Sequence, residues 1–183
     1  HIDCIVFSTK KHGISAVQEL APGVHAHPTN SSSRLLYIWD AIRIGRSIAR
    51  PDVIAAQDPF ETGLAAAFIA HHARTPLVVE AHTDFLSPAF ARHSLLNRLR
   101  LVIAPYVLRR AAAGNAVNEG LKERILKRYR LHLPIAVLPL YVDISRFKQI
   151  VPVPHHRFST TLLWAGRLER EKNPMLALTA LAA

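Results

Sequence analysis

Residues 51–85 read PDVIAAQDPFETGLAAAFIAHHARTPLVVEAHTDF and contain the clearest pattern of secondary structure in the chain. The apolar run 52–56 predicts a short strand, and a turn leads from it into an alanine-rich helix over about 64–72. A second strand is predicted over 76–81 and is followed by His82. Strand, helix and strand in this order form a βαβ unit with parallel strands and a right-handed crossover. Nearly continuous apolar strands are typical of such a sheet.

The segments before this unit predict more elements of the same class. Residues 2–7 and 23–28 are rich in β-forming side chains, so each predicts a strand. The polar residues 30–33 offer N-caps for an amphipathic helix that ends before Pro51.

The segments after the unit are mainly helical. An apolar stripe that begins at Leu95 predicts a helix that Pro105 breaks or kinks, with a second helical piece ending at Gly114. Asn118 is expected to cap a further helix. The inward-facing residues of that helix are Leu121, Ile125, Leu126 and Tyr129. Residues 135–138 predict a strand, and an irregular segment follows it.

The composition indicates a globular protein, since half of the 183 residues are hydrophobic. No apolar run reaches the roughly 20 residues that span a bilayer. The single cysteine, Cys4, lies in a predicted strand and cannot form an internal disulfide, so we expect it to be buried. Without a cationic leader in these residues, we expect a cytoplasmic protein, with peripheral membrane association left open.

The net charge of +10 favours an anionic partner. Many basic residues fall in two segments, namely Arg92, Arg98, Arg100, Arg109 and Arg110, then Lys122, Arg124, Lys127, Arg128 and Arg130. They form either a solvated helix face or a surface for an anionic membrane. We expect no nucleic acid partner, because aromatic residues are few and are not interleaved with the basic ones.

A second informative stretch, residues 160–174, reads TTLLWAGRLEREKNP. An apolar strand, expected over 160–165, runs into Gly166 and Arg167, and Lys172 follows five residues after the arginine. A strand that ends in glycine and arginine brings the backbone and a guanidinium close to an anion. The lysine adds a second positive charge at the start of the next helix, which suits a diphosphate whose charge grows as a bond to it breaks.

These motifs and their order resemble the retaining nucleotide-sugar glycosyltransferases of the GT-B class, family four. The matching pieces are Pro51-Asp52-Val53-Ile54 with Gln57-Asp58-Pro59, Leu77 to His82, Val137-Leu138-Pro139 with Val142-Asp143 and Phe147, and Gly166-Arg167-Leu168 with Lys172. The resemblance covers nearly the whole chain. It implies an α/β fold with a Rossmann-like parallel sheet, truncated at both ends. It also implies an N-terminal acceptor-side domain over 1–148, without its first strand, an interdomain linker over 149–158, and the start of a donor-binding domain over 159–183.

The resemblance also implies roles for individual residues. The family places a histidine close to the transferred sugar, and this catalytic role falls on His82. The family's arginine and lysine hold the donor diphosphate, so that Gly166, Arg167 and Lys172 are expected to bind it and to stabilise leaving-group charge. The implied partners are a nucleotide-sugar donor and a glycan or lipid-linked acceptor.

Further candidates for the cleft are Gln57, Asp58 and Asp84. Asp58 and Glu61 could form a carboxylate pair for acid and base work, and Asp84 could act with His82. The alternative, which we favour, is that Asp58 makes turn or cap hydrogen bonds and that Glu61 lies at the positive end of the following helix.

The histidine pairs invite a metal interpretation. Neighbours such as His71-His72, His155-His156 or His25 with His27 do not converge on one ion without further ligands, so we expect structural or surface histidines, no metal and no cofactor.

The sequence also departs from the family pattern. No glycine-rich loop and no pair of glutamates seven residues apart is present, and Leu140 and Tyr141 replace an Asn-Gly turn. The pattern opens in a strand at His1 and closes in an uncapped apolar segment, so we expect a fragment that is not catalytically competent by itself. The alternatives are a non-enzymatic basic module that binds anionic membrane or nucleic acid, and a nucleotide-sugar epimerase on the same scaffold.

Overall fold

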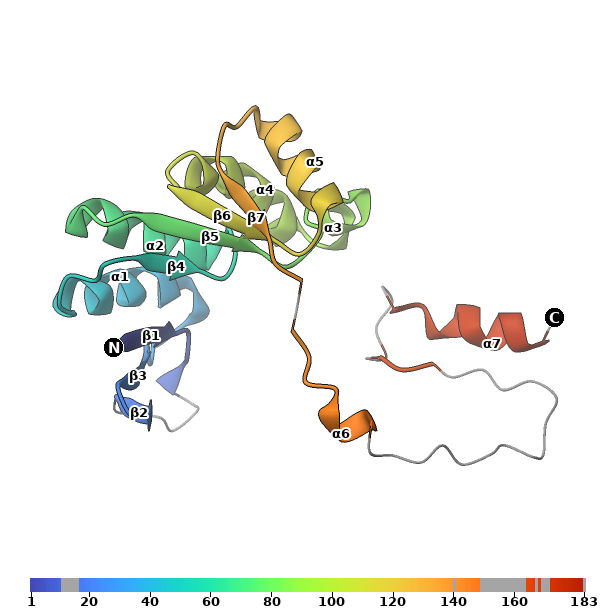
Figure 1. Cartoon of the computed structure of the whole chain (residues 1–183), viewed down its shortest axis with the longest axis horizontal. Coiled ribbons are helices and arrows are strands. Elements are labelled where there is room, and N and C mark those ends of the chain that lie inside the picture. Colours follow the sequence, from blue (N-terminus) through green and yellow to red (C-terminus); the bar gives the residue numbers. More distant parts are fainter. Residues whose placement is uncertain (11–16, 140, 149–163, 167, 169–171, 183) are drawn as a thin grey trace. The chain divides into compact units, whose positions relative to one another are not determined.

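The computed structural model describes residues 1–10, 17–139, 141–148, 164–166, 168 and 172–182. The chain consists of two compact units, His1–Leu140 and Tyr141–Ala183. The first unit alternates strands and helices, as Figure 1 shows, and this confirms the α/β class expected from the sequence.

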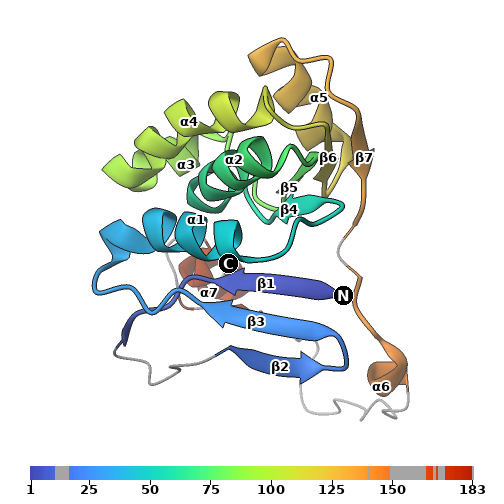
Figure 2. The ribbon, with the colours of Figure 1, turned by 90° about the vertical axis from the view of Figure 1, so that its left-hand side faces the viewer.

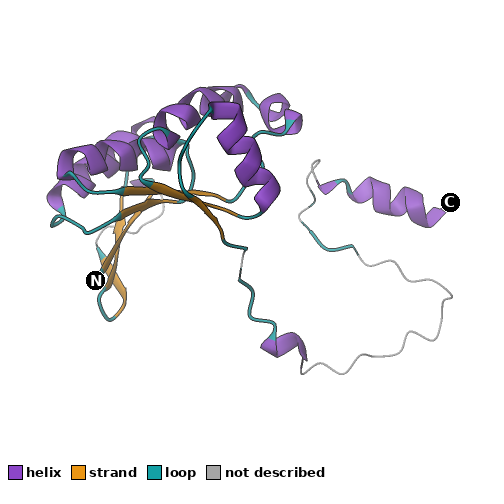
Figure 3. Cartoon of the chain, turned by 45° about the horizontal axis from the view of Figure 1, so that its top comes forward, coloured by secondary structure: helices purple, strands orange, loops and turns teal. Residues whose placement is uncertain are grey.

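A four-stranded parallel sheet lies at the centre of the first unit. Its strands are β4 (Ile54–Ala56), β5 (Leu77–Ala81), β6 (Ala113–Ala116) and β7 (Ile135–Val137), in the order β4-β5-β6-β7. All three strand pairs are parallel. Helix α2 (Glu61–Ala73) joins β4 to β5 and completes the βαβ unit predicted from residues 51–85. Figure 3 shows the helices alongside the strands.

Strand β6 occupies a segment that the sequence pattern assigned to the end of a helix. Gly114 does not stop a helix but lies inside the strand, paired with Val79 on one side and Ile135 on the other. A Cβ atom at this position would lie 3.0 Å from the carbonyl oxygen of Val79. The close approach of the neighbouring backbone, rather than a helix terminus, therefore explains the glycine.

Two helices precede β6, namely α3 (Pro88–His93) and α4 (Leu95–Leu108). Helix α4 continues through Pro105 to Leu108, so the proline does not divide it into two helices. It buries Ala104, Val107 and Leu108, whereas much of the apolar stripe expected from the sequence is exposed. The exposed members of that stripe are Leu95, Leu96, Leu99 and Val102.

A second, three-stranded sheet forms from the N-terminal residues, with strands β1 (Ile2–Val6), β2 (Gln18–Ala21) and β3 (Val24–Pro28). The order is β1-β3-β2, with β1 parallel and β2 antiparallel to β3, as Figure 2 shows. The sequence pattern missed β2. Gly23, with φ of 75°, makes the tight turn between β2 and β3. The expectation that Cys4 is buried was wrong, because its side chain is exposed on β1.

A short 3-10 helix, η2 (Arg34–Leu36), and helix α1 (Tyr37–Ser47) follow β3. The predicted helix is present, but the predicted side-chain caps were wrong. The side chains of the two N-cap residues, Ser33 for η2 and Leu36 for α1, make no capping hydrogen bond. Ser31 is buried, and its backbone N–H donates to the carbonyl of Ser8 at 2.9 Å, so this polar stretch is tied to the end of β1 instead.

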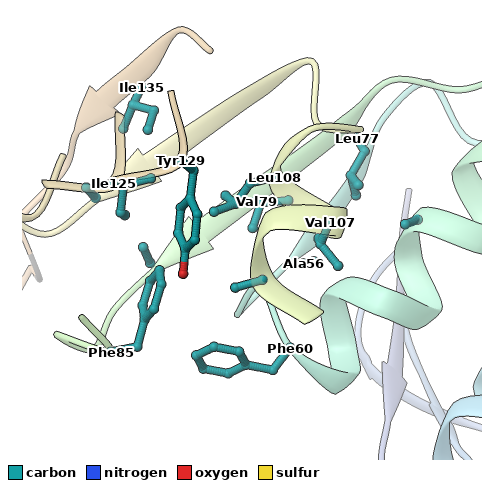
Figure 4. Packing of buried hydrophobic residues seen from close by; sticks show 14 of the residues in the cluster. Ala56, Phe60, Leu77, Val79, Phe85, Val107, Leu108, Ile125, Tyr129 and Ile135 are labelled. Carbon is teal, nitrogen blue, oxygen red and sulfur yellow. The ribbon is translucent and has the colours of Figure 1, made fainter. Parts of the chain in front are cut away.

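The core of the first unit lies between the four-stranded sheet and helices α2, α4 and α5 (Glu119–Tyr129). Leu77 and Val79 come from β5, and Leu121 and Ile125 come from α5 as predicted. Phe85 and Phe60 meet edge to face, with ring centroids 5.4 Å apart. Figure 4 shows the two rings next to each other in the core. Aromatic pairs of this kind contribute about 0.5–1.5 kcal/mol beyond the area that they bury.

The second unit contains helices α6 (Ser145–Lys148) and α7 (Pro174–Ala182). The linker expected over 149–158 lies outside the described residues, as does most of the strand expected over 160–165, whose last two residues are not in a strand. Among the described residues, no helix is both long enough and apolar enough to cross a membrane.

Candidate functional site

The carboxyl ends of the four parallel strands meet at one edge of the sheet. Gln57 and Asp58 follow β4, His82 and Asp84 follow β5, and Asn118 follows β6. The register Ala81↔Ala116 brings the ends of β5 and β6 level with each other. Ligands of open parallel sheets bind beyond these ends of the strands. This edge is therefore the candidate active site.

His82 is held by a carboxylate from the strand that precedes it, β5. Its Nε2 lies 2.7 Å from Oε2 of Glu80. The side chains are partly open to solvent, 39% exposed for His82 and 25% for Glu80. A carboxylate accepts a hydrogen bond, so Nε2 carries the proton when the imidazole is neutral, and Nδ1 then presents a lone pair to a hydroxyl or another donor.

Asp84 is paired with Arg124 of α5, and the carboxylate that contacts His82 comes from Glu80. Nη2 of Arg124 lies 2.8 Å from Oδ2 of Asp84, and both side chains are about half exposed. The ion pair connects the loop after β5 to the helix after β6. That helix begins at Glu119, and Oδ1 of its N-cap residue, Asn118, accepts a hydrogen bond of 2.8 Å from the backbone N–H of Leu121. This confirms the predicted cap.

Asp58 makes the turn hydrogen bond expected of it. Its Oδ1 accepts from the backbone N–H of Phe60 at 2.7 Å. Burial raises the pKa of the Asp58 carboxyl above its ordinary value of 3.8, although the hydrogen bonds from Phe60 and Thr62 act in the opposite direction. Asp58 is therefore a structural acceptor at the start of α2.

Glu61 lies in the first turn of α2, as predicted, and pairs with Arg100 of α4. Nε of Arg100 lies 3.0 Å from each carboxylate oxygen of Glu61. The same guanidinium lies over the ring of Phe60, 5.5 Å from its centroid, and donates to Asn97 at 3.1 Å. Glu61 is thus bound to an arginine, which favours the structural role expected of it over the acid and base pair with Asp58.

The second unit brings two of the predicted donor-binding residues together. A Cβ atom on Gly166 would lie 3.8 Å from Cγ of Lys172 and 3.4 Å from the indole of Trp164. Nε1 of Trp164 donates to the carbonyl of Lys172 at 3.3 Å. Arg167 lies outside the described residues.

Sequence reasoning missed the partners of the site residues. The sequence pattern places Glu80 in a strand and Arg124 on a basic helix, and it gives neither a partner. A signal for Glu80 was present in the sequence, because it is a charged residue inside an apolar strand and comes two positions before a histidine. Two residues at this spacing in an extended chain have their side chains on the same side. No comparable local signal pairs Arg124 with Asp84, which lies 40 positions earlier in the sequence.

The Rossmann-like parallel sheet, with polar residues at the carboxyl ends of its strands, is an α/β domain consistent with the GT-B fold. The sequence profile of Glycosyltransferase Family 4 matches residues 2–146, and the chain belongs to this family. The protein is therefore a glycosyltransferase, which implies a sugar donor and an acceptor in general. No curated protein matches the chain.

Proposed function

We propose that the protein transfers a sugar from a nucleotide-diphosphate-sugar to a hydroxyl of a glycan or lipid-linked acceptor, with retention of the anomeric configuration. The observation that supports this best is the position of His82 beyond the carboxyl end of β5 in a chain of Glycosyltransferase Family 4. Membership of this family favours transfer over the non-enzymatic module and the epimerase that the sequence left open.

In this proposal, His82 is the catalytic residue that contacts the transferred sugar. The contact with Glu80 fixes the plane of the imidazole, and Nδ1 is left to accept a hydrogen bond from a sugar hydroxyl. Because the orientation of the imidazole is already fixed, little side-chain entropy is lost when it binds and orients the sugar. The acceptor side of the same edge includes Gln57, Asp58 and Asp84. Asp58 contributes by holding the conformation of the turn after β4.

The donor diphosphate is assigned to Gly166, Arg167 and Lys172. When the bond from the anomeric carbon to the phosphate oxygen breaks, negative charge grows on the departing diphosphate. A guanidinium and an ammonium placed there stabilise that charge, which is the largest contribution to catalysis in such reactions. The packing of Gly166 against Trp164 and Lys172 supports a compact motif.

The domain boundaries that go with this function are those expected from the sequence. We assign residues 1–148 to the acceptor-side domain, 149–158 to the linker, and 159–183 to the start of the donor-binding domain. By its contacts, α6 belongs to the second compact unit. On this division, the catalytic histidine and the diphosphate-binding residues come from different domains.

Steady-state transfer by the full-length protein, supplied with a panel of nucleotide sugars, tests the proposal. We expect His82→Ala, Arg167→Ala and Lys172→Ala each to lower kcat/KM by at least about a hundredfold while folding is retained, since they remove contacts to the sugar or to the leaving group. His132→Ala, at an exposed position, is the matched control. Undiminished turnover in Arg167→Ala and Lys172→Ala would remove the diphosphate assignment.

A peripheral contact with an anionic membrane is the second part of the proposal, and helix α4 supports it. Leu95, Leu99 and Val102 follow one side of this helix and are 78%, 54% and 70% exposed. Exposed arginines accompany them, including Arg98 and Arg109. Apolar side chains beside basic ones are typical of helices that lie in the interface of an acidic bilayer. The contact would bring the enzyme to a lipid-linked acceptor from the cytoplasmic side.

Vesicle sedimentation tests this contact. We expect binding to vesicles that contain phosphatidylserine, a decrease at high salt, and a loss in the double variant Leu99→Glu/Val102→Glu. Leu20→Glu, at an exposed position on β2, is the control and should bind like the wild type. Binding that depended on neither acidic lipid nor salt would contradict the membrane assignment.

A further inference from the structure

The N-terminal sheet gathers a histidine and carboxylate cluster that lies outside the candidate active site. Each of His1, Asp3 and His25 offers a ligand atom, and these three atoms all lie within 4.8 Å of one another. Two imidazole nitrogens and a carboxylate oxygen are ligands that Zn²⁺ prefers in proteins. We propose that these residues form a binding site for a first-row divalent cation of the Zn²⁺ type, independent of sugar transfer.

The register of the sheet explains why the residues converge. Strands β1 and β3 are parallel, and Asp3 lies directly opposite His25. Side chains opposite each other on neighbouring strands, and side chains two positions apart on one strand, lie on the same face. His1 and Asp3 therefore share a face with His25 and His27. The exposed Cys4 points to the other face, so the ligands are nitrogen and oxygen atoms.

The ligand set that the sequence lacked is supplied from the neighbouring strand. In the sequence, His25 and His27 had no further ligand, but the fold adds Asp3 and His1. Nε2 of His1 lies 3.0 Å from Oδ2 of Asp3, and the rings of His1 and His25 have their centroids 4.8 Å apart. In tetrahedral coordination, two ligand atoms that each lie about 2.1 Å from the metal are about 3.4 Å apart. Small side-chain rotations would therefore bring the three ligand atoms to bonding distance of one ion. On binding, the cation replaces the proton between His1 and Asp3.

A further observation fits a cation better than a closed network of hydrogen bonds. Nδ1 of His25 is buried and has no hydrogen-bond partner within the described part of the chain, although buried polar atoms are nearly always paired. Nε2 of His27 lies 2.7 Å from Oδ1 of Asp3, the oxygen not used toward His1. His27 would thus orient the carboxylate from outside, as outer partners do in metal sites. The bound ion would link β1 to β3 through its ligands.

Titration of the untagged chain with Zn²⁺, followed by calorimetry, and with Co²⁺, followed by visible absorption, tests the site. We expect one tightly bound ion per chain, and a rise in the thermal unfolding midpoint when Zn²⁺ is added. His25→Ala and Asp3→Asn should each weaken binding at least about tenfold and abolish the rise in the midpoint. The double variant His71→Ala/His72→Ala removes two exposed histidines of α2 and controls for adventitious surface binding.

The binding measurements on these variants either support the metal site or overturn it. Loss of the Co²⁺ absorption in His25→Ala and Asp3→Asn, with circular dichroism unchanged and the α2 control binding normally, supports the site. Wild-type affinity in both cluster variants overturns it, as does an equal loss in the α2 control. If Asp3→Asn fails to fold, a comparison of the single variants His25→Ala and His27→Gln decides the question. The proposal requires a larger loss of metal affinity when the ligand His25 is replaced than when the outer partner His27 is replaced.

Discussion

Glu80 and His82 form a contact of 2.7 Å between Oε2 and Nε2 at the point where β5 leaves the sheet. Ala81, between them, is buried in the core, so the backbone that carries both side chains is anchored. The carboxylate therefore determines which ring nitrogen carries the proton and which way the imidazole faces. Glu80 is a positioning residue in our proposal, because it acts through His82.

The first prediction concerns this positioning. We expect Glu80→Ala to lower kcat/KM for sugar transfer about 5-fold to 30-fold, corresponding to about 1–2 kcal/mol for a lost hydrogen bond to a charged partner. Glu80→Gln keeps an acceptor and should recover part of the activity. Steady-state kinetics of the full-length protein measure the effect.

Glu123→Ala, at an exposed position of α5, serves as its control and should leave the kinetics unchanged. In the double variant with His82→Ala, the Glu80→Ala substitution should have almost no additional effect. Full additivity of the two substitutions would show that Glu80 does not act through His82.

The second prediction concerns the cap of α5. Asn118→Ala removes the acceptor of the 2.8 Å hydrogen bond from Leu121 and should lower the free energy of unfolding by about 1 kcal/mol. Asn118→Ser keeps a capping oxygen and should lie within a few tenths of a kcal/mol of the wild type. Urea unfolding measures both. Equal stability of Asn118→Ala and Asn118→Ser would contradict the role of the side chain as a cap.

The parallel sheet was predictable because its signals are local. Apolar runs, a capping asparagine and the helix stripe of Leu121, Ile125 and Tyr129 are each visible within a few residues. Strand β6 was not predictable in the same way. Its sequence, Ala113 to Ala116, has little β propensity, and it is a strand because β5 and β7 lie on either side of it.

The candidate site was predictable in its positions but not in its contacts. His82, Asp84 and Asp58 follow predicted strands, so their place at the sheet edge follows from topology. Their partners depend on packing between elements distant in sequence, as with Asp84 and Arg124. The exposed stripe of α4 shows the same limit, because an apolar pattern indicates a face but not what covers it.

The third prediction compares two helical glycines. A Cβ atom on Gly63 would lie 2.5 Å from the carbonyl oxygen of Asp58 and 2.8 Å from a methyl group of Val107. Because the backbone oxygen cannot move aside cheaply, Gly63→Ala should destabilise the fold by about 1–3 kcal/mol. On Gly120 of α5 the nearest atom would be 3.5 Å away, so Gly120→Ala should be neutral or stabilising by up to about 1 kcal/mol. Thermal unfolding measures both, and a clear destabilisation by both variants would show that these contacts do not decide the effect of the added methyl group.

The fourth prediction concerns pH and Asp58. Because burial raises the pKa of this carboxyl, the folded protein binds the proton more tightly than the unfolded chain does. The stability that this proton provides is complete at pH values below the ordinary pKa of 3.8, and it is lost as pH rises through the higher pKa of the folded state. Asn at this position stays uncharged at all pH values.

The free energy of unfolding of Asp58→Asn, relative to that of the wild type, should therefore increase as pH rises from 3.8 and level off above the folded-state pKa. Urea unfolding at a series of pH values measures the difference. Asp52→Asn, at an exposed position before β4, controls for the loss of one negative charge. A constant difference across the series would show that Asp58 titrates alike in the folded and unfolded chain.

The last prediction concerns the connection between α2 and α4. Arg100 contacts both carboxylate oxygens of Glu61 and covers Phe60, but the side chains of Arg100 and Glu61 are 31% and 24% exposed, so solvent weakens the pair. We expect Arg100→Ala to lower the free energy of unfolding by about 1–2 kcal/mol, partly because buried Asn97 loses its donor.

Arg98→Ala removes an exposed arginine from the same helix and should cost less than about 0.5 kcal/mol. A double-mutant cycle with Glu61→Ala isolates the ion pair, for which we expect a coupling energy of about 0.5–1 kcal/mol that decreases in high salt. If the coupling were absent while Arg100→Ala remained destabilising, the arginine would stabilise the fold through Phe60 and Asn97 alone, and the ion pair would contribute nothing to holding α4 against α2.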